Sequence, residues 1–215
     1  MANPQNVGDV VIQANQSLSL TDVVANSILI WGGGKLTATN IKVTGSVVVF
    51  PLVNGNVTKL HLIDSSVGDS LVINTIDAQG NLYTGSEVPV DVLVSGSYIY
   101  APQGSGSEHT EALRAFGFNR GSRFENTTFV QQGPFNGTAT AVINWHGADT
   151  VFTNCNFLWA NGVAAYYTVY VEGRNNLVTN SRLSKGSASY VYPSSSPKAT
   201  YTSNRDASTS TMISL

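Results

Sequence analysis

A six-residue pattern recurs along the chain and constrains its fold more than any other feature of the sequence. The pattern is an apolar residue, any residue, then Asn, Asp or Gly, two further residues, and an apolar residue. Its six copies are separated by 24 to 32 residues and begin at Ala38, Leu62, Val94, Phe124, Phe152 and Val178. A repeat of this length is typical of solenoids, in which each repeat stacks on the next.

The columns of this repeat have distinct chemistry. The third position holds residue types that tolerate a left-handed backbone, which predicts a stacked turn formed by Asn40, Asp64, Gly96, Asn126, Asn154 and Asn180. The sixth position is always apolar, which predicts a buried column formed by Val43, Val67, Ile99, Phe129, Phe157 and Leu183. A strand, a short bend and a second strand in every repeat describe one coil of a parallel β-helix.

A second alignment supports this interpretation. Placing Gly117, Gly147 and Gly173 in one column puts Leu113 over Ile143 over Val169, as inward residues of a further strand in each coil. The residues next to them are then expected to point outward: Arg114, Asn144 and Tyr170. The alternative fold is a jelly roll or another β-sandwich, which is expected to show turns every 8 to 12 residues without stacked columns.

The two ends of the chain differ from its middle. We expect residues 1–34 to form an N-terminal cap or attachment segment, residues 35–190 the parallel β-helix, and residues 191–215 a Ser/Thr-rich tail that needs a partner to become ordered.

Charge and cysteine content exclude several functions. Only 11% of the residues are charged, the net charge is -2, and the pI is near 5.8, so we expect no nucleic-acid partner. No apolar run approaches the length of a membrane span, and no signal peptide is expected. Cys155 is the single cysteine, which excludes an intramolecular disulfide. The three histidines show no metal-ligand spacing, and we expect neither a metal nor a cofactor.

Two groups of ionisable residues are candidates for catalysis. Glu108, His109, Glu111 and Arg114 form the densest cluster, and glycosidic cleavage needs paired carboxylates of this kind. The competing interpretation is a solvated turn with a local ion pair, since the neighbouring coils offer no acids in the same columns. The other group is His146 and Glu172, which share a column in adjacent coils and are expected to form a cross-strand ion pair.

Aromatic residues are the other candidates for binding. Several tyrosines alternate with inward positions, and exposed rings on such a face stack on sugars or fill a protein interface. Near the C-terminal end we expect the exposed rings of an interface at Tyr190, Tyr192 and Tyr201.

The segments ValSerGlySerTyrIleTyr from Val94 and GluHisThrGluAlaLeuArg from Glu108 carry a family resemblance. The repeat resembles the right-handed parallel β-helices of pectate lyases and phage tailspikes. The second segment is similar to a His-Thr-Asp-Ala-Ile stretch in short β-helical virion proteins of tailed phages. The likeness covers about residues 36–190 and departs from that stretch at Glu111. It implies an all-β, right-handed parallel β-helix of about six coils.

The resemblance also directs the expected function. It implies a non-enzymatic structural protein of a tailed-phage virion, made in the host cytoplasm and assembled as a homotrimer with other virion proteins. The expected positions are a surface-exposed tail appendage, as a minor tail or receptor-binding protein, or a capsid decoration. The alternative is a polysaccharide lyase or glycoside hydrolase that acts on host surface glycans.

Overall fold

The structure is all-β throughout its described part. This computed structural model describes residues 4–101, 111–132, 141–160, 165–193 and 199–215. Every regular element in these ranges is a β-strand. The predicted all-β class is therefore confirmed. No helix within the same ranges is long and apolar enough to cross a membrane.

The strands form three sheets, named here A, B and C. In spatial order, sheet A contains β1 (Gln5–Asn6), β4 (Val23–Ala25), β7 (Lys42–Val43), β10 (Ser66–Val67), β13 (Tyr98–Ala101), β17 (Thr128–Gln132), β20 (Asn156–Ala160), β23 (Arg182–Leu183) and β25 (Arg205–Asp206). Sheet B contains β2 (Val10–Ile12), β5 (Ile28–Trp31), β8 (Val47–Phe50), β11 (Leu71–Ile73), β14 (Leu113–Ala115), β18 (Ile143–Trp145) and β21 (Val169–Val171). Sheet C contains β3 (Ser17–Thr21), β6 (Lys35–Thr39), β9 (Thr58–Ile63), β12 (Val88–Ser95), β16 (Arg123–Glu125), β19 (Val151–Thr153), β22 (Leu177–Thr179) and β24 (Thr200–Thr202), with β15 (Asn119–Arg120) also paired to β12.

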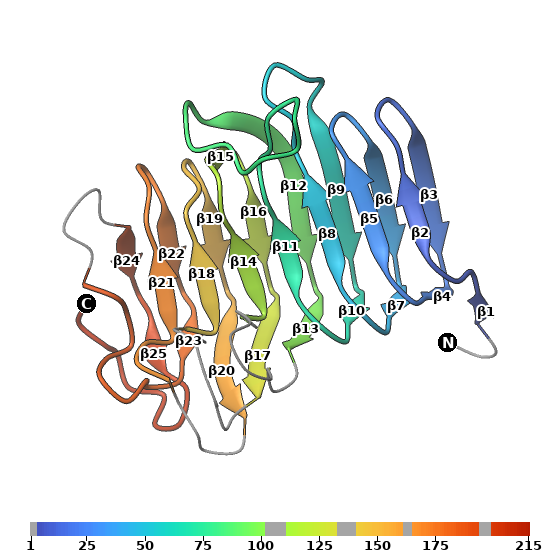
Figure 1. Cartoon of the computed structure of the whole chain (residues 1–215). Coiled ribbons are helices and arrows are strands. Elements are labelled where there is room, and N and C mark those ends of the chain that lie inside the picture. Colours follow the sequence, from blue (N-terminus) through green and yellow to red (C-terminus); the bar gives the residue numbers. More distant parts are fainter. Residues whose placement is uncertain (1–3, 102–110, 133–140, 161–164, 194–198) are drawn as a thin grey trace.

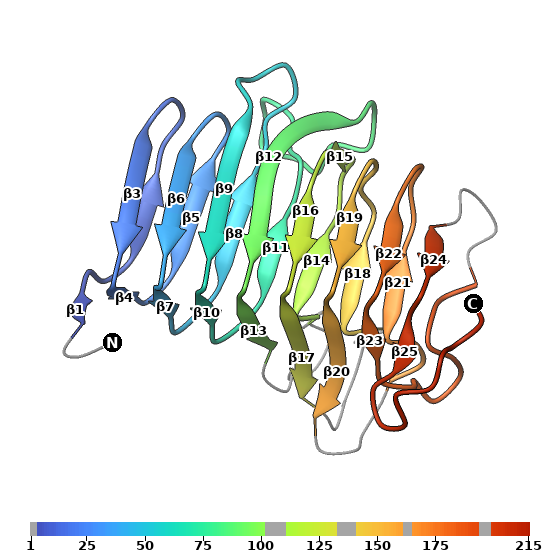
Figure 2. The same ribbon diagram turned by 180° about the vertical axis from the view of Figure 1, so that it is seen from behind.

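The chain visits these sheets in turn. It passes from a strand of sheet B to one of sheet C and then to one of sheet A, and each strand pairs in parallel with its counterparts in the preceding and following passes. Figures 1 and 2 show the strands stacked along one axis, with the two termini at opposite ends. Three all-parallel sheets in this order are compatible with the expected parallel β-helix.

The stacked turn lies between sheets C and A. Each of its positions follows a strand of sheet C and precedes a strand of sheet A, and the φ angles there run from 48° to 61° at Asn40, Asp64, Gly96, Asn126, Asn154 and Asn180. Asn, Asp and Gly reach this left-handed region at least cost, which explains why the repeat uses them there.

The same pattern continues beyond the six copies. A copy starting at Leu20 has its turn at Asp22, with a φ of 56°, and one starting at Tyr201 has its turn at Ser203, with a φ of 55°. Residues 5–31 and 200–206 accordingly belong to the same sheets as the middle of the chain. The boundaries expected at residues 35 and 191 therefore coincide with no break in the sheets.

A polar column follows the turn and links neighbouring strands. The hydroxyl of Ser65 accepts a hydrogen bond from the backbone N–H of Ile41 at 3.1 Å. The hydroxyl of Ser181 accepts one from Cys155 N–H at 3.1 Å, and Oδ1 of Asn204 accepts one from Ser181 N–H at 3.0 Å. These bonds satisfy buried backbone donors at the bend, where the ladder of the sheets is interrupted.

Aromatic columns fill the interior of the C-terminal half. The rings of Phe124 and Phe152 stack at 4.8 Å, and those of Phe129 and Phe157 stack at 5.5 Å. Trp145 meets Phe124 edge to face at 5.3 Å, and all five side chains are fully buried. In-register strands place like residues directly above one another. Trp145 of sheet B therefore packs against the same aromatic core as Phe124 and Phe152 of sheet C.

Candidate functional site

The outward face of sheet B carries two neighbouring columns of aromatic and ionisable side chains. Side chains at one position of successive strands lie about 4.8 Å apart. The first column consists of Arg114, Asn144 and Tyr170, which are register partners, and Tyr192, which follows the bridge of Val191 to Val169. The second column lies two residues further along each strand and consists of Phe116, His146 and Glu172. We call these seven side chains the sheet-B track.

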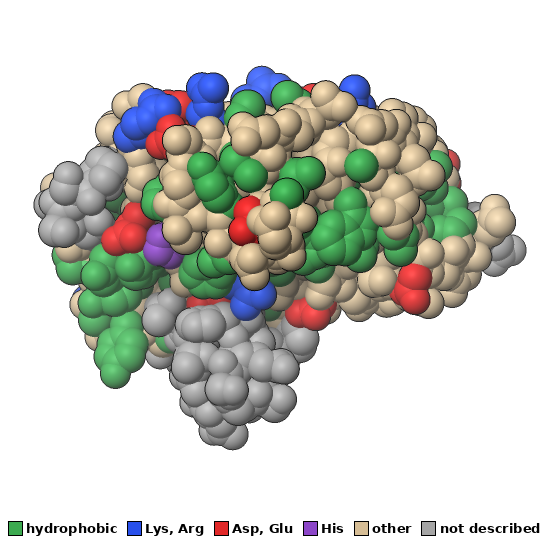
Figure 3. Space-filling model, turned by 45° about the horizontal axis from the view of Figure 1, so that its top comes forward, with side chains coloured by type: hydrophobic (Ala, Val, Ile, Leu, Met, Phe, Trp, Pro, Cys, Tyr) green, Lys and Arg blue, Asp and Glu red, His purple; other side chains and the backbone are tan. Residues whose placement is uncertain are grey.

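The rings of the sheet-B track are in contact from strand to strand. The centroid of Phe116 lies 5.4 Å from that of His146, and His146 lies 5.4 Å from Tyr170. Tyr170 stacks on Tyr192 at 4.1 Å, and the guanidinium of Arg114 lies 5.5 Å from the Phe116 centroid. Figure 3 shows a histidine beside an acidic side chain among hydrophobic ones on this side of the molecule. The rings thus form a continuous, half-buried surface.

His146 is the centre of the polar contacts in the track. Its Nδ1 lies 3.2 Å from Oε2 of Glu172, and its Nε2 lies 3.0 Å from Oδ1 of Asn144. Burial lowers the pKa of His146, while the negative charges of Glu172 and Glu111 oppose this effect. Burial also raises the pKa of Tyr170 well above its usual range, so its phenol stays neutral. The predicted ion pair of His146 and Glu172 is therefore present as a contact.

The structure brings the two predicted groups of ionisable residues together. Glu111 is completely buried, and its charge acts on His146, while Arg114 belongs to the same track. Glu108 and His109 lie outside the described residues. For Glu111, the interpretation as part of a solvated turn is wrong, because its side chain is withdrawn from water.

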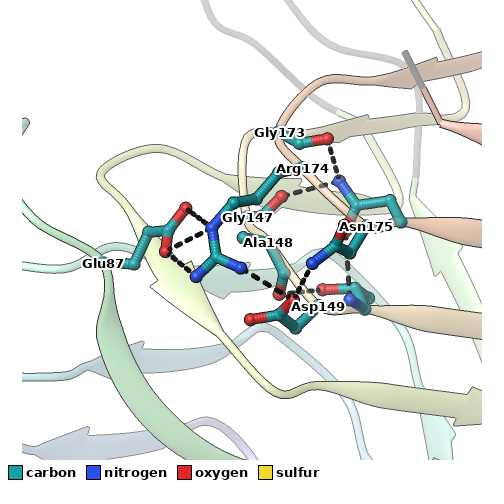
Figure 4. A network of polar contacts seen from close by, with 9 residues as sticks. Glu87, Gly147, Ala148, Asp149, Gly173, Arg174 and Asn175 are labelled. Atoms are coloured by element: carbon teal, nitrogen blue, oxygen red, sulfur yellow. Dashed lines mark hydrogen bonds and ion pairs between the residues drawn. The ribbon is translucent and has the colours of Figure 1, made fainter. Parts of the chain in front are cut away.

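A polar network fixes the turns that follow His146 and Glu172 (Figure 4). Nε of Arg174 lies 3.1 Å from both carboxylate oxygens of Glu87, and Nη1 lies 3.1 Å from Oδ1 of Asp149. The amide of Asn175 donates to the same Asp149 oxygen at 2.8 Å. A bidentate contact of Arg with a carboxylate is geometrically specific. The contacts of Arg174 join its turn to Asp149 and to Glu87, which lie 25 and 87 residues earlier in the sequence. Sequence reasoning missed Glu87, Asp149 and Arg174.

The residue types of the track define what it can do chemically. Flat aromatic rings provide stacking surfaces for sugar rings, and an imidazole next to carboxylates is able to donate and accept protons near neutral pH. Within the described ranges, no group of three or more His, Cys, Asp or Glu side chains is placed to hold a metal ion. The chemistry suggested by this face is therefore stacking, hydrogen bonding and proton transfer.

The three C-terminal tyrosines are half-buried, whereas the sequence led us to expect exposed rings. Tyr201 is the register partner of Val178 and takes an inward position of sheet C, and burial raises the pKa of its phenol. The hydroxyl of Tyr190 donates to Oδ2 of Asp206 at 2.6 Å. Tyr192 and Tyr201 line a cavity of about 460 Å³ together with Val171, Val191, Pro193, Ala199, Thr200 and Leu215. Tyr201 belongs to β24, the terminal strand of sheet C, and Tyr192 follows the bridge to β21, the terminal strand of sheet B.

The fold and the site together define an all-β protein with three parallel sheets and an aromatic, ionisable track on one of them. No protein-family model, no curated protein and no solved structure matches this chain.

Proposed function

We propose that the chain is a right-handed parallel β-helix whose coils include the six copies of the repeat. The order of the strands supports this proposal, since the chain passes from sheet B to C to A and returns to B in each pass. Parallel connections are right-handed in nearly all proteins. The resemblance to short virion proteins of tailed phages points in the same direction.

On this fold we propose a structural protein of a tailed-phage virion, positioned as a tail appendage with a receptor-binding role or as a capsid decoration, and assembled as a homotrimer. The observation that supports a surface role is the sheet-B track. Its rings are partly exposed, and the partly exposed side chains of Arg114 and Glu172 lie beside them. This mixture suits sugars, which stack their apolar faces and hydrogen-bond through their hydroxyls. We therefore propose host surface glycans as the ligand.

The test of this proposal is binding of the purified protein to cell-wall and capsular polysaccharides of candidate hosts. Tyr170→Ala and Tyr192→Ala are expected to weaken the binding roughly tenfold or more, by the loss of a stacking surface. The matched control is Tyr98→Ala, which removes an exposed ring from sheet A, where Tyr98 stacks on Tyr100 at 6.4 Å. Equal binding by all four proteins overturns the assignment of this face.

The position in the virion needs its own experiment. Gold-labelled antibodies against the chain are expected to label either the tail or the capsid of intact particles in electron micrographs. Particles that contain no copy of the chain, as shown by mass spectrometry of purified virions, contradict the structural role.

A second candidate function is cleavage of the same glycans by a hydrolase or lyase. The observation that favours it is the contact of His146 with Glu172, close to the buried carboxylate of Glu111. Two carboxylates and a histidine are the residue types that general acid and base catalysis uses.

A further inference from the structure

Two arginines lie side by side at the C-terminal end of sheet A, away from the sheet-B track. Arg182 in β23 and Arg205 in β25 are register partners on neighbouring parallel strands, and both side chains are exposed. Their backbones are therefore about 4.8 Å apart. Like charges on directly opposed positions of a sheet are destabilising, so an anion bound between the two arginines would stabilise this arrangement.

The described part of the chain does not supply that charge. None of its carboxylates lies within ion-pair distance of Arg182 or Arg205. The nearest acid in sequence, Asp206, is turned inward and accepts hydrogen bonds from Tyr190, Ser208 and Thr209. One donor of Arg205, Nη1, is held by the carbonyl of Ser210 at 2.8 Å. The side chain of Arg182 is exposed.

Both arginines border one polar cavity. Its volume is about 470 Å³, and it is lined by Asn180, Ser181, Arg182, Ser203, Arg205 and Met212. Asn180 and Ser203 occupy the left-handed turns, with φ angles of 51° and 55°, which present their side chains beside the arginines. The cavity therefore combines two positive charges with hydroxyl and amide groups.

We propose that this cavity binds an oxyanion, a carboxylate or a phosphate, carried by an anionic polysaccharide. Arginine presents a planar set of donors that matches both groups. A sugar fits better than an acidic protein surface, because the lining is hydroxyl and amide with Met212 as its one apolar side chain, whereas protein interfaces are anchored by aromatic rings. The choice of a polysaccharide rests on the proposed function; the oxyanion site does not.

The experiment measures inorganic phosphate binding by calorimetry and thermal shift at constant ionic strength. Phosphate is expected to bind the unmodified protein and to raise its Tm. Arg182→Gln and Arg205→Gln are expected to bind it roughly tenfold or more weakly, as for loss of a hydrogen bond between charged groups. The matched control is Arg123→Gln, which removes an exposed arginine of sheet C whose register partners are Leu93 and Val151. The control is expected to bind phosphate as the unmodified protein does.

A second measurement keeps the proposal independent of folding defects. In phosphate-free buffer of low ionic strength, Arg182→Gln is expected to have a Tm at least as high as that of the unmodified protein, because a repulsive contact is removed. The proposal is overturned if phosphate raises the Tm of Arg182→Gln and of the unmodified protein equally. It is also overturned if Arg182→Gln lowers the Tm without phosphate, since Arg182 then stabilises the fold within this chain.

Two oligosaccharide probes distinguish the source of the anion. Oligogalacturonate carries carboxylates, and a glycerol phosphate oligomer carries phosphates. Binding of either one that weakens in Arg182→Gln identifies the natural group, and binding of neither overturns the polysaccharide half of the proposal. Failure of this proposal is distinguishable from failure of the proposed function. The tyrosine variants of sheet B test glycan binding at a different face, and the glycans used there include neutral ones.

Discussion

Oε2 of Glu172 lies 3.2 Å from Nδ1 of His146, so an acid and an imidazole from consecutive passes of the chain form a half-buried pair on sheet B. Burial lowers the pKa of His146 from its ordinary value of 6.5, and Glu172 and Glu111 counteract part of that effect. The charged groups that act on His146 thus include both carboxylates. The pKa of His146 therefore depends both on its burial and on these two carboxylates.

The lowered pKa of His146 predicts a loss of stability in weak acid. Below about pH 6.5 the imidazole of the unfolded chain binds a proton that the native protein resists, so the unfolded state binds more protons and the free energy of unfolding falls as the pH falls. Above that pH the imidazole is neutral in both states and contributes no pH dependence. Urea unfolding between pH 7.5 and 5.5 measures the effect, and His146→Gln is expected to reduce it.

Glu172→Gln is expected to change the pH dependence in the opposite direction to His146→Gln. Removing this carboxylate takes away an interaction that favours the charged imidazole, so the pKa of His146 is expected to fall further. The loss of stability in weak acid should then become steeper than in the unmodified protein. A dependence that is the same in all three proteins contradicts the assigned role of burial at His146.

The stacked pair of Phe129 and Phe157 predicts a large effect of truncation. Phe157→Ala removes a fully buried ring that stacks at 5.5 Å on its counterpart, and it is expected to cost roughly 3 to 5 kcal/mol of unfolding free energy. Leu158→Ala is the control, because the neighbouring side chain is only half-buried and should cost less. Denaturant unfolding measures both variants. An equal loss of unfolding free energy in the two variants contradicts the predicted inward position of Phe157.

The turn column predicts a test of backbone strain. Asn154 is exposed and has a φ of 54°, a conformation that β-branched residues disfavour. Asn154→Val is expected to destabilise the protein by about 1 to 2 kcal/mol, whereas Asn154→Gly should be nearly neutral. For a chain of this size, the Tm of the valine variant should fall by roughly 2 to 8 °C. A glycine variant that is as unstable as the valine variant indicates a side-chain contact instead of strain.

The columns of the repeat make much of the fold predictable from the sequence. Stacking is in register, so aligning Leu113 with Ile143 and Val169 gives the observed pairing of β14, β18 and β21. The copy at Leu20 fits the same pattern. The copy at Tyr201 departs from it in two positions, with Ser203 at the turn and Asp206 in place of the apolar residue. Tyr201 therefore escaped recognition as an inward residue, although its position 23 residues after Val178 is the signal.

The candidate site was only partly predictable, for a physical reason. The period of the repeat predicts which residues share a column, and it placed His146 beside Glu172. It does not predict which side chains from different columns contact each other. Glu111 precedes β14 and belongs to another column, yet its charge acts on His146. Likewise, Glu87 contacts Arg174 although the two residues are 87 positions apart, and the repeat pattern does not relate their positions. Such contacts depend on loop conformation, which the repeat does not determine.

The proposed homotrimer predicts a mass of about three times 22.8 kDa in light scattering. Deleting the residues after Pro193 is a poor test, because it removes β24 and β25 from their sheets. Tyr201→Ser is a better variant, since it deletes no strand and removes a half-buried ring that lies outside the sheet-B track. It is expected to lower the mass at micromolar concentration. A monomeric unmodified protein contradicts the trimer in solution.

The last prediction separates glycan binding from glycan cleavage. If the protein only binds, incubation with host polysaccharide releases no new reducing ends and no unsaturated sugars, and Glu172→Gln changes affinity alone. If it cleaves, Glu172→Gln and His146→Gln are expected to reduce the rate about a hundredfold or more, as for loss of a general acid or base. Glu125→Gln is the control, because this carboxylate lies on sheet C between Ser95 and Thr153. We expect the first outcome, since the non-enzymatic role is the leading proposal. Release of sugar products that depends on Glu172 and not on Glu125 replaces it with the enzymatic one.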